Sequence, residues 1–230
     1  MKERIYSIPL TDALNEGCGC ILCTIEKKLQ EDAVSYYLGP SLMEPDNREI
    51  TNDKGFCPTH LKMLLSGNNR LGLALILETH MLELAKKIKP VKKSGLFSKD
   101  TDAVLTSQSL FNAVKSCALC DKLNMQMKDV AGNLAYLWKE ENDFRNMFEQ
   151  NGNLCLEHAS LVISVCDDEL GGKKREEFIK IILEGQKNAL NELYDDLHAF
   201  TLSFDYRNTE KPSKKVNESV DSTVKHLSKF

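Results

Sequence analysis

Four short pairs of metal-ligating residues alternate along this chain of 230 residues, two of the form Cys-x-x-Cys and two of the form Cys-x-x-His. Thiolate and imidazole groups are the ligands that zinc prefers, and three thiolates with one imidazole complete a tetrahedral shell. The pairs are Cys20 and Cys23, Cys57 and His60, Cys117 and Cys120, and Cys155 and His158. The sequence therefore predicts two closed metal sites, each with three cysteines and one histidine.

The order and separation of the pairs predict how they combine. In each half of the chain a Cys-x-x-His follows a Cys-x-x-Cys by about 34 residues, and the period from Cys20 to Cys117 is 97 residues. This regularity favours a tandem duplication in which each copy binds its own ion. We expect one site from Cys20, Cys23, Cys57 and His60, and the other from Cys117, Cys120, Cys155 and His158.

A filled shell of four protein ligands leaves no position for a water molecule to be activated. We therefore predict two structural zinc ions, each contributing on the order of 10 kcal/mol to folding. The alternative is that the eight residues hold no ion. The chain carries no phosphate-binding glycine loop and no known hydrolase or metalloprotease motif, so whether it is an enzyme stays open.

Hydrophobic periodicity predicts an all-α fold that would position these ligands. Each Cys-x-x-Cys opens a helix. Each Cys-x-x-His is followed by a short apolar helix, Leu61–Leu65 or Ala159–Val165, and then by a long one. The long helices are expected at Leu71–Lys89 and from about Lys173 to Phe204. The return segment Pro40–Phe56 has the composition of an extended loop, and Tyr6–Leu10 offers at most one short strand.

These elements suggest four regions. Residues 1–89 form the first metal-binding helical repeat, and 90–108, rich in Lys, Ser and Asp, form a linker. Residues 109–204 form the second repeat, and 205–230 a polar C-terminal tail with at most a short helix. Two further cysteines fall outside the repeat pattern: Cys18, a bystander or an additional thiol near the first site, and Cys166, which we expect in the core.

The composition restricts the partners. A net charge of -4 argues against general affinity for nucleic acid or anionic membranes. The longest apolar run, Leu71–Leu77, is too short to span a bilayer, and the N-terminus lacks the apolar core of a signal peptide. We therefore expect a cytoplasmic protein, in which eight cysteines favour metal binding over disulfides.

Several strings of residues occur together in a way that resembles one known family. They are Cys18–Cys23, Tyr37–Pro40, Met43–Asp46, Gly55–His60, Asn69–Leu75 and Phe204–Asn208. Together they resemble an uncharacterised bacterial family, domain-of-unknown-function family 6062, whose members are sometimes labelled transporter substrate-binding proteins. The resemblance covers nearly the whole chain, and it implies no known activity.

Three functions remain open at this point. The first is a zinc-stabilised helical interaction module that binds a protein partner through its surface or tail. The second is a thiol redox sensor that releases zinc when oxidation forms a Cys20–Cys23 or Cys117–Cys120 disulfide. The third is an iron-sulfur protein or another redox-metal protein. In addition, the loop Met43–Arg48, with Arg70 and His80, is either a wall of a ligand pocket or a polar connector.

Overall fold

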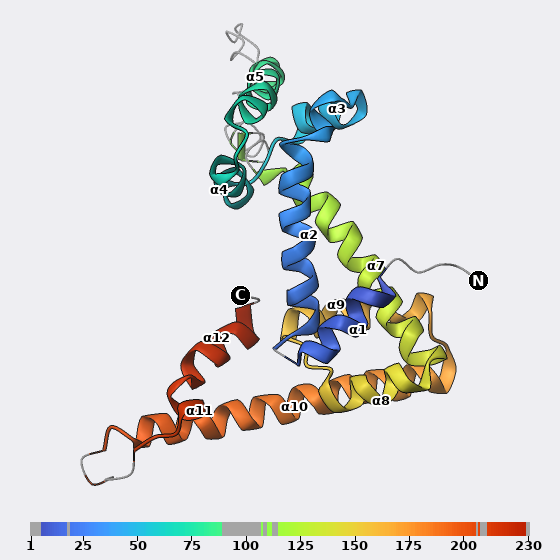
Figure 1. Cartoon of the computed structure of the whole chain (residues 1–230), viewed down its shortest axis with the longest axis vertical. Coiled ribbons are helices and arrows are strands. Elements are labelled where there is room, and N and C mark those ends of the chain that lie inside the picture. Colours follow the sequence, from blue (N-terminus) through green and yellow to red (C-terminus); the bar gives the residue numbers. More distant parts are fainter. Residues whose placement is uncertain are drawn as a thin grey trace, which may run out of the picture. The chain divides into compact units, whose positions relative to one another are not determined.

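The computed structural model describes residues 6–17, 19–88, 107, 110–111, 115–205, 207 and 211–228 (Figure 1). Every regular element in these ranges is a helix, so the all-α prediction is confirmed. The α-helices are α1 (Ser7–Glu16), α2 (Ile21–Tyr37), α3 (Pro45–Lys54), α4 (Pro58–Ser66), α5 (Arg70–Lys87), α7 (Ala118–Glu140), α8 (Asn142–Asn151), α9 (Leu156–Val165), α10 (Gly172–Leu202), α11 (Lys214–Asn217) and α12 (Ser219–Ser228). Two 3-10 helices, η1 (Pro40–Met43) and η2 (Cys166–Asp168), complete the described part.

The chain forms two compact units. Unit 1 comprises residues 1–27 and 126–230, and unit 2 comprises residues 28–125. The division falls inside α2 and α7, so each of these helices contributes one end to each unit.

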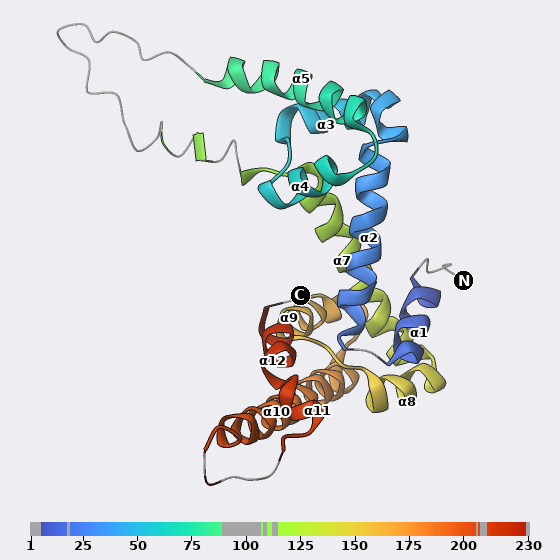
Figure 2. The ribbon, with the colours of Figure 1, turned by 60° about the vertical axis from the view of Figure 1, so that its left-hand side comes forward.

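In unit 2, α3 packs along α5 (Figure 2). Arg48 of α3 donates to the carbonyl oxygen of Leu75 at 2.8 Å and to the hydroxyl of Thr79 at 2.7 Å. Nδ1 of His80 lies 2.9 Å from the carbonyl oxygen of Asn52. Arg48 and His80 therefore join two helices, which agrees with the polar-connector interpretation of this segment rather than with a pocket wall.

The prediction of an extended loop over Pro40–Phe56 is wrong, because most of this segment is η1 and α3. Pro45 occupies the first turn of α3, where its fixed φ suits a helix start. Gly55 ends the helix at φ 58°, and a Cβ atom there would lie 2.4 Å from Nε2 of His80. Glycine is therefore required where the chain leaves α3 for the Cys-x-x-His pair.

In unit 1, the core forms around aromatic side chains of α7, α8 and α10. Trp138 and Phe178 are fully buried, and their ring centroids lie 4.9 Å apart. Phe148 packs against Phe178 at 6.2 Å, and the guanidinium of Arg145 lies 4.4 Å from the Trp138 ring. α9 contacts both α10 and α12 at the edge of this core.

The ends of the chain are more helical than the sequence indicates. The segment predicted as a possible short strand, Tyr6–Leu10, belongs almost entirely to α1, which buries Leu10 and Leu14. Two helices, α11 and α12, follow in the C-terminal region, where Lys215 pairs with Asp196 of α10 at 3.0 Å. The predicted linker 90–108 lies outside the described residues apart from residue 107, and so does Cys18.

The order of helices is the same in the two halves of the chain. The series α2, α3, α4 and α5 corresponds in order to α7, α8, α9 and α10, and in both series a ligand pair stands at the start of the first and third helix. The order agrees with a duplication, which remains our interpretation of the repeated pattern.

Candidate metal centres

The eight predicted ligands gather into two groups of four. The unit 1 group is Cys20, Cys23, Cys155 and His158; the unit 2 group is Cys57, His60, Cys117 and Cys120. In each group the four ligand atoms lie within 4.8 Å of one another. Each group could hold a metal ion, and among the described cysteines every thiol is free of disulfides.

The predicted pairing within each repeat is wrong, because each group takes its Cys-x-x-Cys from one half of the chain and its Cys-x-x-His from the other. The reason lies in the helix that follows the first pair. α2 has 17 residues, which span about 25 Å at 1.5 Å per residue. The chain then enters α3, which packs on α5 instead of returning to Cys20.

All four ligand pairs stand at helix N-termini. The first cysteine of each pair directly precedes α2, α4, α7 or α9, and the second ligand lies one turn further on. The carbonyl oxygen of each first cysteine accepts the N–H of the residue four positions later: Cys20 from Thr24, Cys57 from Leu61, Cys117 from Asp121 and Cys155 from Ala159. Two helix N-termini therefore meet at each group, where their partial positive charge favours thiolates.

A backbone hydrogen bond of the same kind joins the two ligand segments in each group. In unit 1, the N–H of Ile21 donates to the carbonyl oxygen of Asn153 at 3.1 Å. In unit 2, the N–H of Ala118 donates to the carbonyl oxygen of Gly55 at 2.9 Å. Each donor directly follows the first cysteine of a Cys-x-x-Cys, and each acceptor stands two residues before the cysteine of a Cys-x-x-His. In each group, the backbone therefore joins the same Cys-x-x-Cys and Cys-x-x-His segments, from opposite halves of the chain, that the ligand side chains bring together.

The spacing of the ligand atoms suits a tetrahedron. The sulfur atoms of Cys23 and Cys155 lie 3.8 Å apart, and those of Cys57 and Cys120 lie 3.7 Å apart. In each group Nδ1 of the histidine lies 3.3 to 3.4 Å from all three sulfur atoms. Metal–sulfur bonds of roughly 2.3 Å and metal–nitrogen bonds of roughly 2.0 Å give tetrahedral edges of about 3.8 and 3.5 Å. The four atoms of each group therefore surround one ion position.

The outer nitrogen of each histidine faces a polar side chain of α2. Nε2 of His158 lies 3.3 Å from a carboxylate oxygen of Glu26. Nε2 of His60 lies 2.9 Å from the side-chain amide nitrogen of Gln30. When Nδ1 binds a metal, Nε2 carries the proton and needs an acceptor. The Glu26 carboxylate can serve as that acceptor for His158, whereas the Gln30 amide can do so for His60 only when it is turned so that its oxygen faces Nε2.

The pKa values of Cys120 and His158 are both raised in the ligand groups. Burial, followed by the Cys117 thiol, raises the pKa of Cys120. Burial lowers the pKa of His158, but hydrogen bonds with Cys155, Cys20 and Glu26 outweigh it and raise the pKa to about 11. A divalent ion would displace the protons that the raised pKa values of Cys120 and His158 hold on these two groups.

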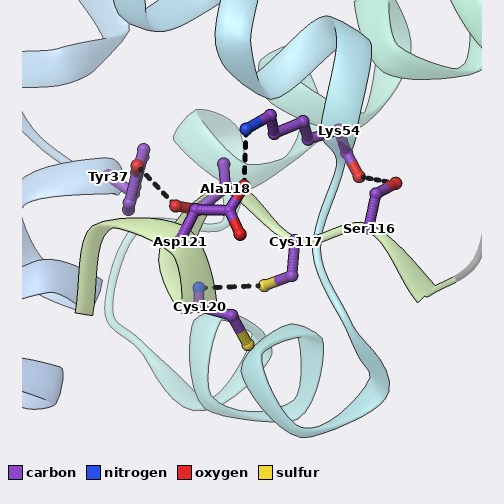
Figure 3. A network of polar contacts seen from close by, with 7 residues as sticks. All are labelled: Tyr37, Lys54, Ser116, Cys117, Ala118, Cys120 and Asp121. Carbon is purple, nitrogen blue, oxygen red and sulfur yellow. Dashed lines mark hydrogen bonds and ion pairs between the residues drawn. The ribbon is translucent and has the colours of Figure 1, made fainter. Parts of the chain in front are cut away.

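Polar contacts fix the start of α7 against the rest of unit 2 (Figure 3). The hydroxyl of Ser116 donates to the carbonyl oxygen of Lys54 at 2.7 Å, and the Lys54 ammonium pairs with Asp121 at 2.5 Å. The N–H of Cys120 lies 3.4 Å from the sulfur of Cys117, a contact that stabilises a thiolate. Tyr37 donates to the carbonyl oxygen of Ala118, and burial raises the pKa of Tyr37 to about 12.

Residue spacing did not reveal the contacts of Glu26 and Gln30, which look like ordinary polar positions of a helix. The position of Glu26, three residues after Cys23, was the available signal, because it places the carboxylate one turn from a ligand. Cys166 is fully buried in unit 1, as expected, and its thiol donates to the carbonyl oxygen of Ile163.

The structure thus defines a helical protein with two Cys3His groups, each suited to one metal ion. No helix in the described ranges is both long enough and apolar enough to traverse a bilayer. The chain belongs to a family of unknown function, DUF6062, whose model matches residues 1–229, so the family resemblance is confirmed. Comparison with curated proteins and with solved structures gives no match.

Proposed function

We propose that this protein is a helical interaction module that two structural zinc ions hold together. The observation that carries the proposal is that each group has four convergent protein ligands, taken from both halves of the chain. A metal ion there links segments far apart in sequence, from Cys20 to His158 and from Cys57 to Cys120. Four protein ligands fill the tetrahedron, so the ion has a structural role and no open position for a substrate.

Zinc fits these groups better than iron does. Thiolate-rich tetrahedral sites are typical of structural zinc. The four ligand atoms lie within 4.8 Å of one another, which suits one ion rather than a cluster of several irons with bridging sulfides.

Elemental analysis of the untagged protein, paired with a thiol count before and after denaturation, tests the metal assignment. We expect two zinc ions per chain, and ligand thiols that react only after unfolding. A chain without bound metal would contradict the proposal. A brown protein that contains iron would mean that iron, and not zinc, occupies the two sites.

A redox sensor is the second candidate, and the sulfur positions favour a particular form of it. Cys23 and Cys155 lie 3.8 Å apart, and Cys57 and Cys120 lie 3.7 Å apart. A peroxide could take two electrons from such a pair, forming a disulfide and water or alcohol while zinc departs. Reversible zinc release at low peroxide, with disulfides between the two halves, would favour the sensor over the module.

The interaction role rests on an apolar face of α5. Leu73 and Ile76 of this helix are buried within unit 2. The opposite side is exposed in the described part of the chain, and all but one of its central residues are apolar. These residues are Leu71, Ala74, Leu75, Glu78, Met81, Leu82 and Ala85. Their spacing of three and four residues makes one continuous stripe, which is typical of a surface that binds another protein.

The charge on the apolar face of α5 indicates which kind of partner would fit it. Glu78 is the one acidic residue within the apolar stripe, and it lies midway between Leu71 and Ala85. Pairing α5 with α5 of a second copy in register would set one Glu78 against the other. The partner that fits is therefore an amphipathic helix of another protein with a basic residue at the centre of its apolar face.

Replacing Leu75 and Leu82 together by serine tests the apolar face. Both side chains are substantially exposed, 45% and 60%, so we expect the melting temperature to stay within a few degrees of the wild type. Fluorescence of a hydrophobic dye bound to the protein should fall severalfold, because the dye loses its apolar surface.

The matched control is Ile8→Ser, which removes an exposed apolar side chain of α1, outside the α5 face. It should leave the dye signal unchanged. A large loss of stability in the double variant would mean that the face is covered within the chain. A dimer in sedimentation that the double variant disrupts would make a second copy the occupant.

A further inference from the structure

The two metal centres differ in the group that supports the histidine. The carboxylate of Glu26 faces His158 in unit 1, whereas the neutral amide of Gln30 faces His60 in unit 2. We propose that the unit 1 site therefore holds its zinc more tightly, and that the unit 2 site releases zinc first. This inference rests on the proposed function, because it concerns the same two ions.

The physical basis is the acceptor that each histidine meets when Nε2 carries the proton. In unit 1 a carboxylate oxygen of Glu26 lies 3.3 Å from Nε2, whereas in unit 2 the amide nitrogen of Gln30 lies 2.9 Å from it. Nδ1 faces the sulfur atoms in both groups, so Nε2 carries the proton when the metal is bound. A carboxylate accepts that proton in a charge-assisted bond, which is stronger than a bond to a neutral amide. The bond increases the electron density that the imidazole gives to the metal, and loss of such a partner typically costs about 10- to 100-fold in metal affinity.

The burial of Glu26 and His158 maintains the difference between the carboxylate and the amide as supports of the two histidines. The side chain of Glu26 is only 13% exposed, and that of His158 is 1% exposed. Solvent therefore screens the charge of the carboxylate weakly. The remaining features of the two groups correspond: three sulfur atoms around Nδ1, two helix N-termini and one connecting backbone hydrogen bond. The residue that faces Nε2 of the histidine, Glu26 or Gln30, is thus the clearest chemical difference between the two sites.

Unequal sites would give the protein a graded response to zinc shortage. The unit 2 ligands Cys57 and His60 stand at the start of α4, and α4 contacts α5. Loss of the unit 2 ion would therefore loosen the unit that carries the apolar face of α5. The unit 1 group would still hold its own ion under the same conditions.

Timed alkylation of the zinc-loaded protein in excess chelator tests this order. Mass spectrometry identifies which cysteines react at each time. We expect Cys57, Cys117 and Cys120 to be alkylated at least about 10-fold faster than Cys20, Cys23 and Cys155. Equal rates in the two groups, or the reverse order, would overturn the inference.

Exchanging the two supporting residues separates their effect from general damage to the fold. Glu26→Gln should speed alkylation of the unit 1 cysteines about 10-fold or more, and Gln30→Glu should slow that of the unit 2 cysteines. The double exchange should reverse the order of release, an outcome that a purely structural role would not give. Glu31→Gln, which changes an exposed acid of the same helix, is the matched control and should change neither rate.

The outcomes also separate this inference from the proposed function. Two bound zinc ions with rates that do not respond to either exchange would overturn the inference and leave the structural role intact. A chain that binds no zinc at all would overturn both.

Discussion

Excess chelator is expected to unfold much of the zinc-loaded protein. Each ligand group joins segments from both halves of the chain, and a structural zinc ion bound there would contribute about 10 kcal/mol or more. That contribution is comparable with the whole stability of a typical domain, about 5–15 kcal/mol. At about 2–4 °C per kcal/mol, loss of one ion should lower the melting temperature by roughly 20 °C or more.

Circular dichroism with and without chelator measures this effect, through the helical signal at 25 °C and through the melting curve. Adding zinc back in excess should restore both, whereas magnesium should not, because hard cations bind thiolates poorly. A melting curve that does not respond to chelator would show that the helices pack without metal.

Cys155→Ser is expected to remove one zinc ion per chain and to destabilise the protein strongly. Cys155 is buried, and its sulfur lies 3.8 Å from that of Cys23 and 3.4 Å from Nδ1 of His158. A hydroxyl group is a poor ligand for zinc, so the three remaining ligands no longer complete the shell. Elemental analysis should therefore give one zinc ion in place of two.

Cys166→Ser is the matched control, because Cys166 is a buried cysteine of the same unit that belongs to neither group. It should retain two zinc ions and lose much less stability. Two ions retained in the Cys155 variant would contradict its role as a ligand.

The local structure around the ligands was predictable from the sequence. A Cys-x-x-Cys or a Cys-x-x-His that opens an apolar-periodic segment indicates a helix start, and α2, α4, α7 and α9 all begin at such a pair. The eight residues could also be predicted to form two groups of four, because metal-ligand chemistry depends on residue type more than on the path of the chain.

The sequence does not predict which Cys-x-x-Cys shares a ligand group with which Cys-x-x-His, because residue spacing alone does not determine the path of the chain after α2. The prediction that Cys57 returns to Cys20 depended on reading Pro40–Phe56 as a loop. Pro45 instead starts a helix, and Arg48 and Asn52 fix that helix to α5 through tertiary contacts that sequence periodicity does not reveal. The contacts of Glu26 and Gln30 with the two histidines were missed for the same reason.

Timed alkylation of zinc-loaded Cys57→Ser tests most directly whether the ligand pairs are exchanged between the two halves. The structure predicts that Cys117 and Cys120 lose their protection, because they share a group with Cys57, while Cys20 and Cys23 remain protected. Loss of protection at Cys20 and Cys23, with Cys117 and Cys120 still protected, would show that each half of the chain builds its own site and would contradict this account.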